Sequence, residues 1–250
     1  MATPYVTYEE QDELGSELVR ARENKVSRKR AYVDVIALAE SFGLVVQYDN
    51  FAEADPNRDG FLANGIDPLK VWRDGKRVDV VFPEGTIVIE NYLRAPDKET
   101  KLRFNIAHEI AHHINSIHQH ESSFHSQFDP EMTYTHTDLQ KLFSIREAQA
   151  DDMAGILLTP SYKLQEVFRR ITGGKLLTRY GDRTVDADTM DMITEMATEM
   201  RVSYTTMRIR LEKLHLFDKK PISNYIEGDR FNLDFPAQNY YGDCEDELPF

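Results

Sequence analysis

The pattern of apolar and polar positions divides the chain into a mixed first part and a longer helical part. Residues 8–23 are polar and helix-prone, and residues 31–42 form an amphipathic pattern that ends at Gly43. Residues 44–48 have the apolar composition of a strand, and a loop rich in Asp, Asn, Pro and Gly follows them. A helical pattern then extends from about residue 97 to about residue 217.

Two further strands are expected between that loop and the helical part. Residues 78–82 and 86–90 are apolar and β-prone, and residues 83–85 read as the turn of a hairpin between them. The strand at 86–91 is expected to be a sheet edge, able to pair with an extended peptide. Strand-rich segments followed by helices predict an α+β fold, with a small antiparallel or mixed sheet packed on a helix and a helical C-terminal part.

Composition divides the chain into four expected regions. They are an N-terminal polar helix or arm at 1–30, a main domain at 31–172, a helical subdomain at 173–220 and an acidic, aromatic tail at 221–250. Residues 188–216 resemble a helix–turn–helix, which indicates either DNA binding or a helical cap on the main domain. Basic and acidic residues are nearly balanced from Asp191 to Lys220, so direct DNA binding is the less favoured alternative.

Charge and cysteine content exclude several classes of function. The 250 residues include 30 basic and 43 acidic ones, a net charge of −13, which argues against wholesale phosphate binding and against an anionic membrane surface as partner. One cysteine excludes a disulfide framework and a multi-cysteine metal site. The chain shows neither a secretory signal nor an apolar run long enough to span a membrane, so a cytoplasmic protein is expected.

The sharpest chemical signal is the segment His108-Glu109-Ile110-Ala111-His112 within a helical pattern. On a helix, His108 and His112 lie one turn apart on the same face, so both imidazoles can reach one metal ion. Glu109 is rotated by about 100° and lies beside such an ion, where a general base can take a proton from water. The motif by itself lacks a third ligand.

A second helical pattern, residues 139–158, offers that ligand. Its apolar face extends back to Glu147 and includes Asp151, and two carboxylates on a buried face need partners. Glu147 would complete a His₂Glu site, and Asp151 could accept the second N–H of a ligating histidine. The alternative is that residues 144–147 form a capping box, with Glu147 at a helix end.

Three motifs in order resemble the ImmA/IrrE metallopeptidases: residues 103–112, residues 147–151 and residues 157–160. Family members carry HExxH, then ExxAD or ExxAN, then a short apolar stretch that ends in proline. The resemblance covers about residues 31–215 and implies a minimal gluzincin fold and a zinc-dependent endopeptidase that cleaves a transcriptional repressor. It implies one Zn²⁺ per chain on His108, His112 and Glu147, with Glu109 as catalytic base. Ala111 departs from the family, which usually has glycine there, and the stretch from His112 to Glu147 is long.

That long stretch is rich in histidine, with His113, His118, His120, His125 and His136 outside the motif. These residues could form a second metal site, although such histidines are more often solvated loop residues. His136, Tyr134 and Tyr162 are candidates for a donor that stabilises the oxyanion of a hydrolytic intermediate. The sequence does not choose among them.

The competing interpretation is a regulatory zinc protein of a toxin–antitoxin or phage system. Such a protein would bind a repressor or DNA without cleaving anything, and its zinc would be structural. Glu109 argues against it, because a structural metal site has no use for a non-ligating base. The favoured partner is therefore a protein substrate, a helix–turn–helix repressor.

Overall fold

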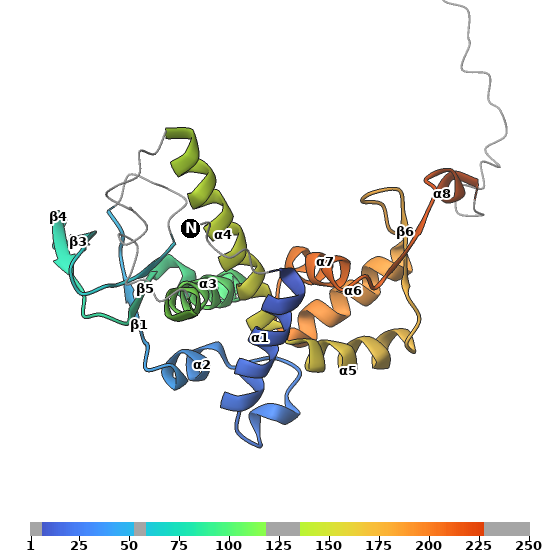
Figure 1. Ribbon diagram of the computed structural model, residues 1–250, viewed down its shortest axis with the longest axis horizontal. Helices are drawn as coiled ribbons and strands as arrows, with labels where there is room; N and C mark the ends of the chain where they lie inside the picture. The colour runs from blue at the N-terminus through green and yellow to red at the C-terminus, as the bar shows by residue number, and fades with distance from the viewer. Residues whose placement is uncertain (1–6, 53–58, 119–135, 228–250) are drawn as a thin grey trace, which may run out of the picture.

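The computed structural model describes residues 7–52, 59–118 and 136–227, and these residues form the predicted α+β fold (Figure 1). Its first half contains two α-helices and five strands: α1 (Tyr8–Arg22), α2 (Val35–Ser41), β1 (Val45–Asp49), β2 (Gly60–Leu62), β3 (Pro68–Arg73), β4 (Lys76–Val81) and β5 (Thr86–Glu90). Its second half is mainly helical: α3 (Glu99–His118), α4 (His136–Leu158), α5 (Ser161–Thr172), β6 (Leu177–Tyr180), α6 (Ala187–Met200), α7 (Tyr204–Lys213), β7 (Phe217–Lys220) and α8 (Ser223–Glu227).

The main sheet has the strand order β1-β5-β2, so β5 is its central strand. Strand β1 pairs with β5 in parallel, and β2 pairs with it antiparallel. The side chains of Ile87 and Ile89 enter the main apolar core, whereas Val88 enters a second cluster on the other face. The expectation that this strand is a sheet edge is therefore wrong, because its unbroken apolar run reflects burial on both faces.

The predicted hairpin between residues 78–82 and 86–90 is also wrong. Strand β4 pairs with β3 instead, through a turn at Asp74 and Gly75 with φ angles of 51° and 74°. Positive φ at both central residues is the mark of a tight hairpin turn, and Asp-Gly is a strong local signal for it. The stretch at 83–85 instead leads into the main sheet, where the Gly85 N–H donates to the Ala63 carbonyl at 3.0 Å.

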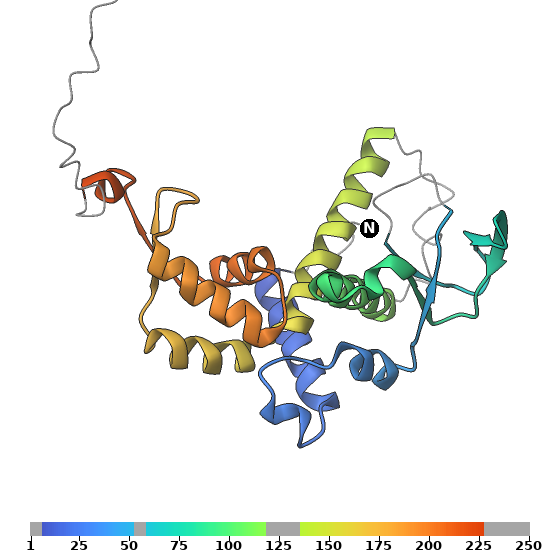
Figure 2. The same cartoon turned by 180° about the vertical axis from the view of Figure 1, so that it is seen from behind.

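Helices α3 and α4 lie between the sheet at one end of the molecule and α5, α6 and α7 at the other (Figures 1 and 2). Helix α1 packs against α4 and does not form a separate arm. Val19 is fully buried, and a Cβ added at Gly15 would lie 2.6 Å from Ile156. The polar helix at residues 8–23 was predicted, but its close packing on α4 was not.

The C-terminal helices share one core with the central helices. Residues of α6 and α7, including Ile193, Met196, Met207 and Leu211, belong to the same apolar cluster as α3 and α4. Only three residues separate α6 from α7, so the predicted pair of helices is present. Strands β6 and β7 form a short parallel pair that the helical pattern did not reveal.

Each helix in the described part of the chain is too short or too polar to span a bilayer. Of the predicted tail, residues 221–227 are described and contain α8, whereas residues 228–250 lie outside the described part.

Candidate metal centre

Helix α3 places His108 and His112 on the same side of the helix. Its opposite side is fully apolar and buried, through Ile106, Ala107, Ile110, Ala111 and Ile114. This burial determines the rotation of the helix about its axis. His108 and His112, four residues apart, therefore lie next to each other, with their ring centroids 4.6 Å apart.

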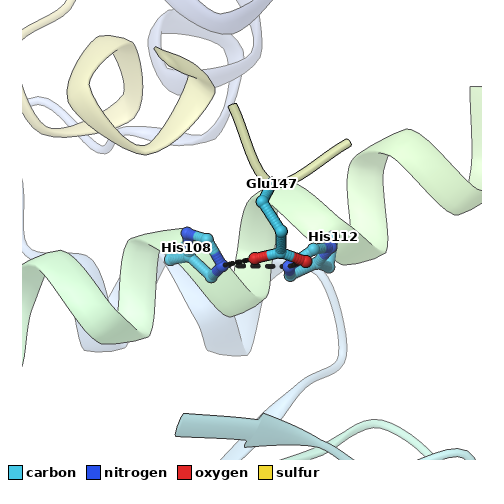
Figure 3. A group of neighbouring side chains, drawn as sticks. All are labelled: His108, His112 and Glu147. Carbon is cyan, nitrogen blue, oxygen red and sulfur yellow. Dashed lines mark hydrogen bonds and ion pairs between the residues drawn. The ribbon is translucent and has the colours of Figure 1, made fainter. Parts of the chain in front are cut away.

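Helix α4 brings Glu147 to these histidines, as Figure 3 shows. The Oε2 atom of Glu147 lies 3.2 Å from Nε2 of His108, and its Oε1 atom lies 3.6 Å from Nε2 of His112. The two Nε2 atoms are 2.9 Å apart. Because α4 begins at His136, residues 144–147 lie inside the helix, and the capping-box alternative is excluded.

These three groups fit a tetrahedral metal ion. Zinc binds histidine nitrogen and carboxylate oxygen at about 2.0–2.2 Å, which places neighbouring ligand atoms about 3.3–3.5 Å apart. The observed separations of 2.9, 3.2 and 3.6 Å lie close to that value. Three side chains leave a fourth tetrahedral position for another ligand, as in catalytic sites. Within the described residues, His108, His112 and Glu147 thus form a group able to hold a metal ion.

The electrostatics of the group also suit a cation. Burial would lower the pKa of His108, but its hydrogen bonds to Asp151 and Glu147 outweigh burial and raise that pKa to about 10. Hydrogen bonds from His108 and His112 hold the pKa of Glu147 far below its usual value. Two carboxylates beside the imidazole of His108 therefore make this position favourable for positive charge, which a metal ion would also supply.

Asp151 lies one helical turn after Glu147 and holds His108 from behind. Its Oδ1 atom is 2.9 Å from Nδ1 of His108, so the imidazole bonds a carboxylate on one side and faces the ligand group on the other. The side chains of Glu147 and Asp151 are 50% and 59% exposed, so the premise that both are buried was wrong. They lie at the edge of the apolar face of α4, and the histidines provide the partners that burial was expected to demand.

Glu109 follows His108 directly on α3, is not one of the three converging groups, and is only 7% exposed. Strand β2 lies directly against it: a Cβ added at Gly60 would be 2.6 Å from Oε1 of Glu109. Asp59, the preceding residue, bonds the hydroxyl of Tyr92 at 2.8 Å and the ammonium of Lys101 at 2.5 Å. These bonds tie the start of β2 to α3, so the strand and the carboxylate are held together.

Comparison with known proteins adds no family to this geometry. No family model matches the chain, and no curated protein matches it. The case for a metal centre therefore depends on the residues of the site themselves.

Of the three candidate oxyanion donors, only Tyr162 has a described side chain, and it bonds away from the ligand group. The Tyr162 hydroxyl donates to Glu23 at 2.7 Å, which joins α5 to the end of α1. His136 opens α4, but its side chain lies outside the described part, as does all of Tyr134. Among the additional histidines, His113 packs its ring edge against Phe42, and residues 119–135 are not described.

Sequence patterns missed Gly60, because no local periodicity relates it to Glu109. The contact arises only when β2 joins β5 and the sheet packs on α3. A glycine that opens a short strand was the available signal, since glycine within a strand often marks a close approach by another group.

Replacement of Asp151 by alanine is expected to weaken zinc affinity about 10–100-fold, because the ring of His108 loses the carboxylate that orients it. Competition with a fluorescent chelator measures this. Asp152→Ala is the matched control, since Asp152 pairs with Lys213 at 3.1 Å instead. Equal affinities of the two variants would contradict the role of Asp151.

Proposed function

We propose that this protein is a zinc-dependent endopeptidase. The observation that carries the proposal is the convergence of two imidazole nitrogens and one carboxylate within 3.6 Å, with a further carboxylate, Glu109, on the same helix. A structural metal site is normally closed by four protein ligands, whereas the described residues offer three to this group. The triad and the base together favour hydrolysis over a structural metal.

His108, His112 and Glu147 would hold the ion, and zinc in such a site polarises a carbonyl and makes water a stronger nucleophile at neutral pH. Glu109 would accept the proton of the attacking water and pass it to the leaving amine. Asp151 keeps the Nε2 side of His108 turned toward the ligand group through its bond to Nδ1. Burial of Glu109 limits exchange of its proton with bulk solvent.

An extended substrate would bind along β2, at the edge of the main sheet among the described strands. Among the described strands β2 pairs only with β5, and at Gly60 it lies against the carboxylate of Glu109. A peptide strand added at this edge would run beside the base and the ligand group. The protein substrate is expected to be a helix–turn–helix repressor, an expectation that rests on the resemblance to the ImmA/IrrE metallopeptidases.

The test combines metal content with cleavage of defined peptides. Zinc-loaded wild-type protein should carry about one zinc per chain and generate new termini in a peptide library and in the repressor encoded beside its gene, as read by mass spectrometry. His112→Ala should lose most of the zinc and the cleavage. His113→Ala, the adjacent histidine packed on Phe42, should retain both. Zinc binding without any new terminus would support the regulatory alternative.

Gly60→Ala is expected to reduce the turnover number about 10–100-fold without loss of zinc, since an added methyl group would displace the carboxylate of Glu109. Paired measurements of kcat and zinc content check this. Gly43→Ala provides the control, because Gly43 has a φ of +78° and no atom within 4 Å of its added Cβ. Gly60 is not among the glycines with positive φ, so Gly60→Ala adds the steric contact without this strain, and a normal kcat in Gly43→Ala would show that strain elsewhere does not lower turnover. A Gly60→Ala enzyme with normal kcat would show that β2 does not position the base.

A further inference from the structure

A cavity of about 370 Å³ lies next to the ligand group. Its wall is formed by residues of α1, α3, α4 and α7, among them Thr100, Phe104, Asp151, Gly155 and Ile209. None of these residues is a predicted metal ligand. The proposed hydrolysis, as described so far, gives the cavity no role.

The cavity continues the faces of α3 and α4 that carry the ligands. On α3, Thr100 and Phe104 precede His108 at intervals of four residues, and all three lie on one side of the helix. The rings of Phe104 and His108 are 6.4 Å apart. The side of α3 that carries the histidine ligands therefore continues directly into the wall of the cavity.

Helix α4 repeats the same arrangement. Asp151 and Gly155 follow Glu147 at intervals of four residues, and both line the cavity. The carboxylate that bonds His108 is thus also part of the cavity wall. One helical turn is about 5.4 Å, a distance that an extended peptide covers in fewer than two residues.

The chemistry of the wall indicates a neutral occupant. The ammonium of Lys101 bonds Asp59, the carboxylate of Asp152 bonds Lys213 and the guanidinium of Arg210 bonds Asp12. The carboxylate of Asp151 bonds the imidazole of His108. Since each charged side chain of the wall already has a partner, a charged occupant would gain no new pairing and would lose hydration.

The size and the apolar residues of the wall indicate a bulky occupant. Phe104 contributes an aromatic ring, and Ile209 is a 41% exposed aliphatic side chain on α7. Gly155 leaves room inside the wall, because an added Cβ would meet only Arg210, at an ordinary 3.5 Å. A large aliphatic or aromatic side chain fits such a space.

We infer that this cavity is the specificity pocket of the proposed peptidase and receives a bulky apolar side chain next to the scissile bond. The inference rests on the proposed function, and it names the class of substrate that the site accepts. Helix α7 thereby contributes to substrate selection through Ile209. The C-terminal helices are part of the substrate site and not merely a cap on it.

The experiment uses a series of succinyl hydroxamates, which share a zinc-binding group and differ in one side chain: methyl, isobutyl, benzyl, carboxymethyl or aminobutyl. Calorimetry with the zinc-loaded wild-type protein should show isobutyl or benzyl binding at least about 10-fold tighter than methyl. The two charged side chains should bind more weakly than methyl. Equal affinities across the series, or no binding, would overturn the pocket.

Variants of Ile209 locate the preference in this cavity. Ile209→Trp fills the space, so the advantage of isobutyl over methyl should fall to less than about 3-fold while the affinity for methyl is retained. Ile209→Glu should instead favour aminobutyl. Ile36→Trp, at a similarly exposed position on α2 outside the wall, should leave the whole series unchanged. An unaltered preference in Ile209→Trp contradicts the inference.

These outcomes separate the pocket from the proposed function. Hydroxamates that bind with the expected preference to a protein that cleaves no peptide would refute hydrolysis and leave the pocket intact. Peptide cleavage without any preference for bulky apolar side chains next to the cut would refute the pocket alone.

Discussion

Replacement of Glu109 by glutamine is expected to lower the rate of peptide hydrolysis about 10²–10⁴-fold while zinc remains bound. The amide has nearly the same shape as the carboxylate but cannot accept a proton from water. Glu109 is not one of the three converging groups, so its loss leaves the ligand set complete. Peptide hydrolysis followed by mass spectrometry, beside zinc analysis of the same sample, measures both quantities.

A matched variant on the same helix separates chemistry from folding. Glu99 lies at the start of α3, where its carboxylate is 53% exposed and 3.4 Å from Arg201. Glu99→Gln makes the identical change of charge on α3 and should hydrolyse peptides at close to the normal rate. Normal turnover by Glu109→Gln would refute the proposed mechanism. Loss of zinc from this variant would instead show that Glu109 supports the metal centre itself.

The helices of the site could be predicted because their information is local. The four-residue spacing of His108 and His112 needs only a helix to become a pair of neighbouring ligands. Glu147 was found by extending the apolar face of the later helix, although the argument assumed more burial than the structure shows. What the sequence could not give was the distance between α3 and α4. That distance depends on the shared core and not on either helix alone.

The strands were harder to pair than to locate. The boundaries of β5 were predicted at residues 86–90, and that prediction is confirmed. Its partners were wrong, because a short connection at 83–85 looked like a hairpin turn, whereas β4 turns back on β3 at Asp74 and Gly75. Pairing depends on which faces are buried by distant segments, and a short apolar strand carries little information about that.

Features that arise only from tertiary contacts were not predictable from patterns along the chain. The contact between Gly60 and Glu109 joins a strand to a helix about fifty residues later, and the cavity is bounded by four helices. The buried Arg210 is a third case. On α7 it reads as one more basic residue of a solvated helix, yet its side chain is only 2% exposed.

Arg210 joins the C-terminal helices to the rest of the core. Its guanidinium donates to Asp12 on α1 at 2.7 Å and to both the hydroxyl and the carbonyl of Thr159 at 3.0 Å. It also donates to the hydroxyl of Tyr8. One side chain therefore satisfies groups from α1 and from the junction between α4 and α5, and all of these contacts end if it is removed.

Arg210→Met is expected to lower the free energy of unfolding by about 3–5 kcal/mol, because it removes the buried guanidinium that pairs with Asp12 and donates to the Thr159 carbonyl. For a chain of this size, that loss corresponds to a decrease in Tm of about 6–20 °C, which calorimetry and urea unfolding would both detect. Arg208→Met on the same helix is the control. Arg208 is 29% exposed and lies 3.5 Å from Glu212, a helical pair that contributes at most about 0.5 kcal/mol.

The double variant Arg210→Met with Asp12→Asn should recover part of the lost stability, since it also removes the carboxylate charge that Arg210 had paired. If Arg210→Met were as stable as Arg208→Met, Arg210 would not be holding α7 against α1 and α4.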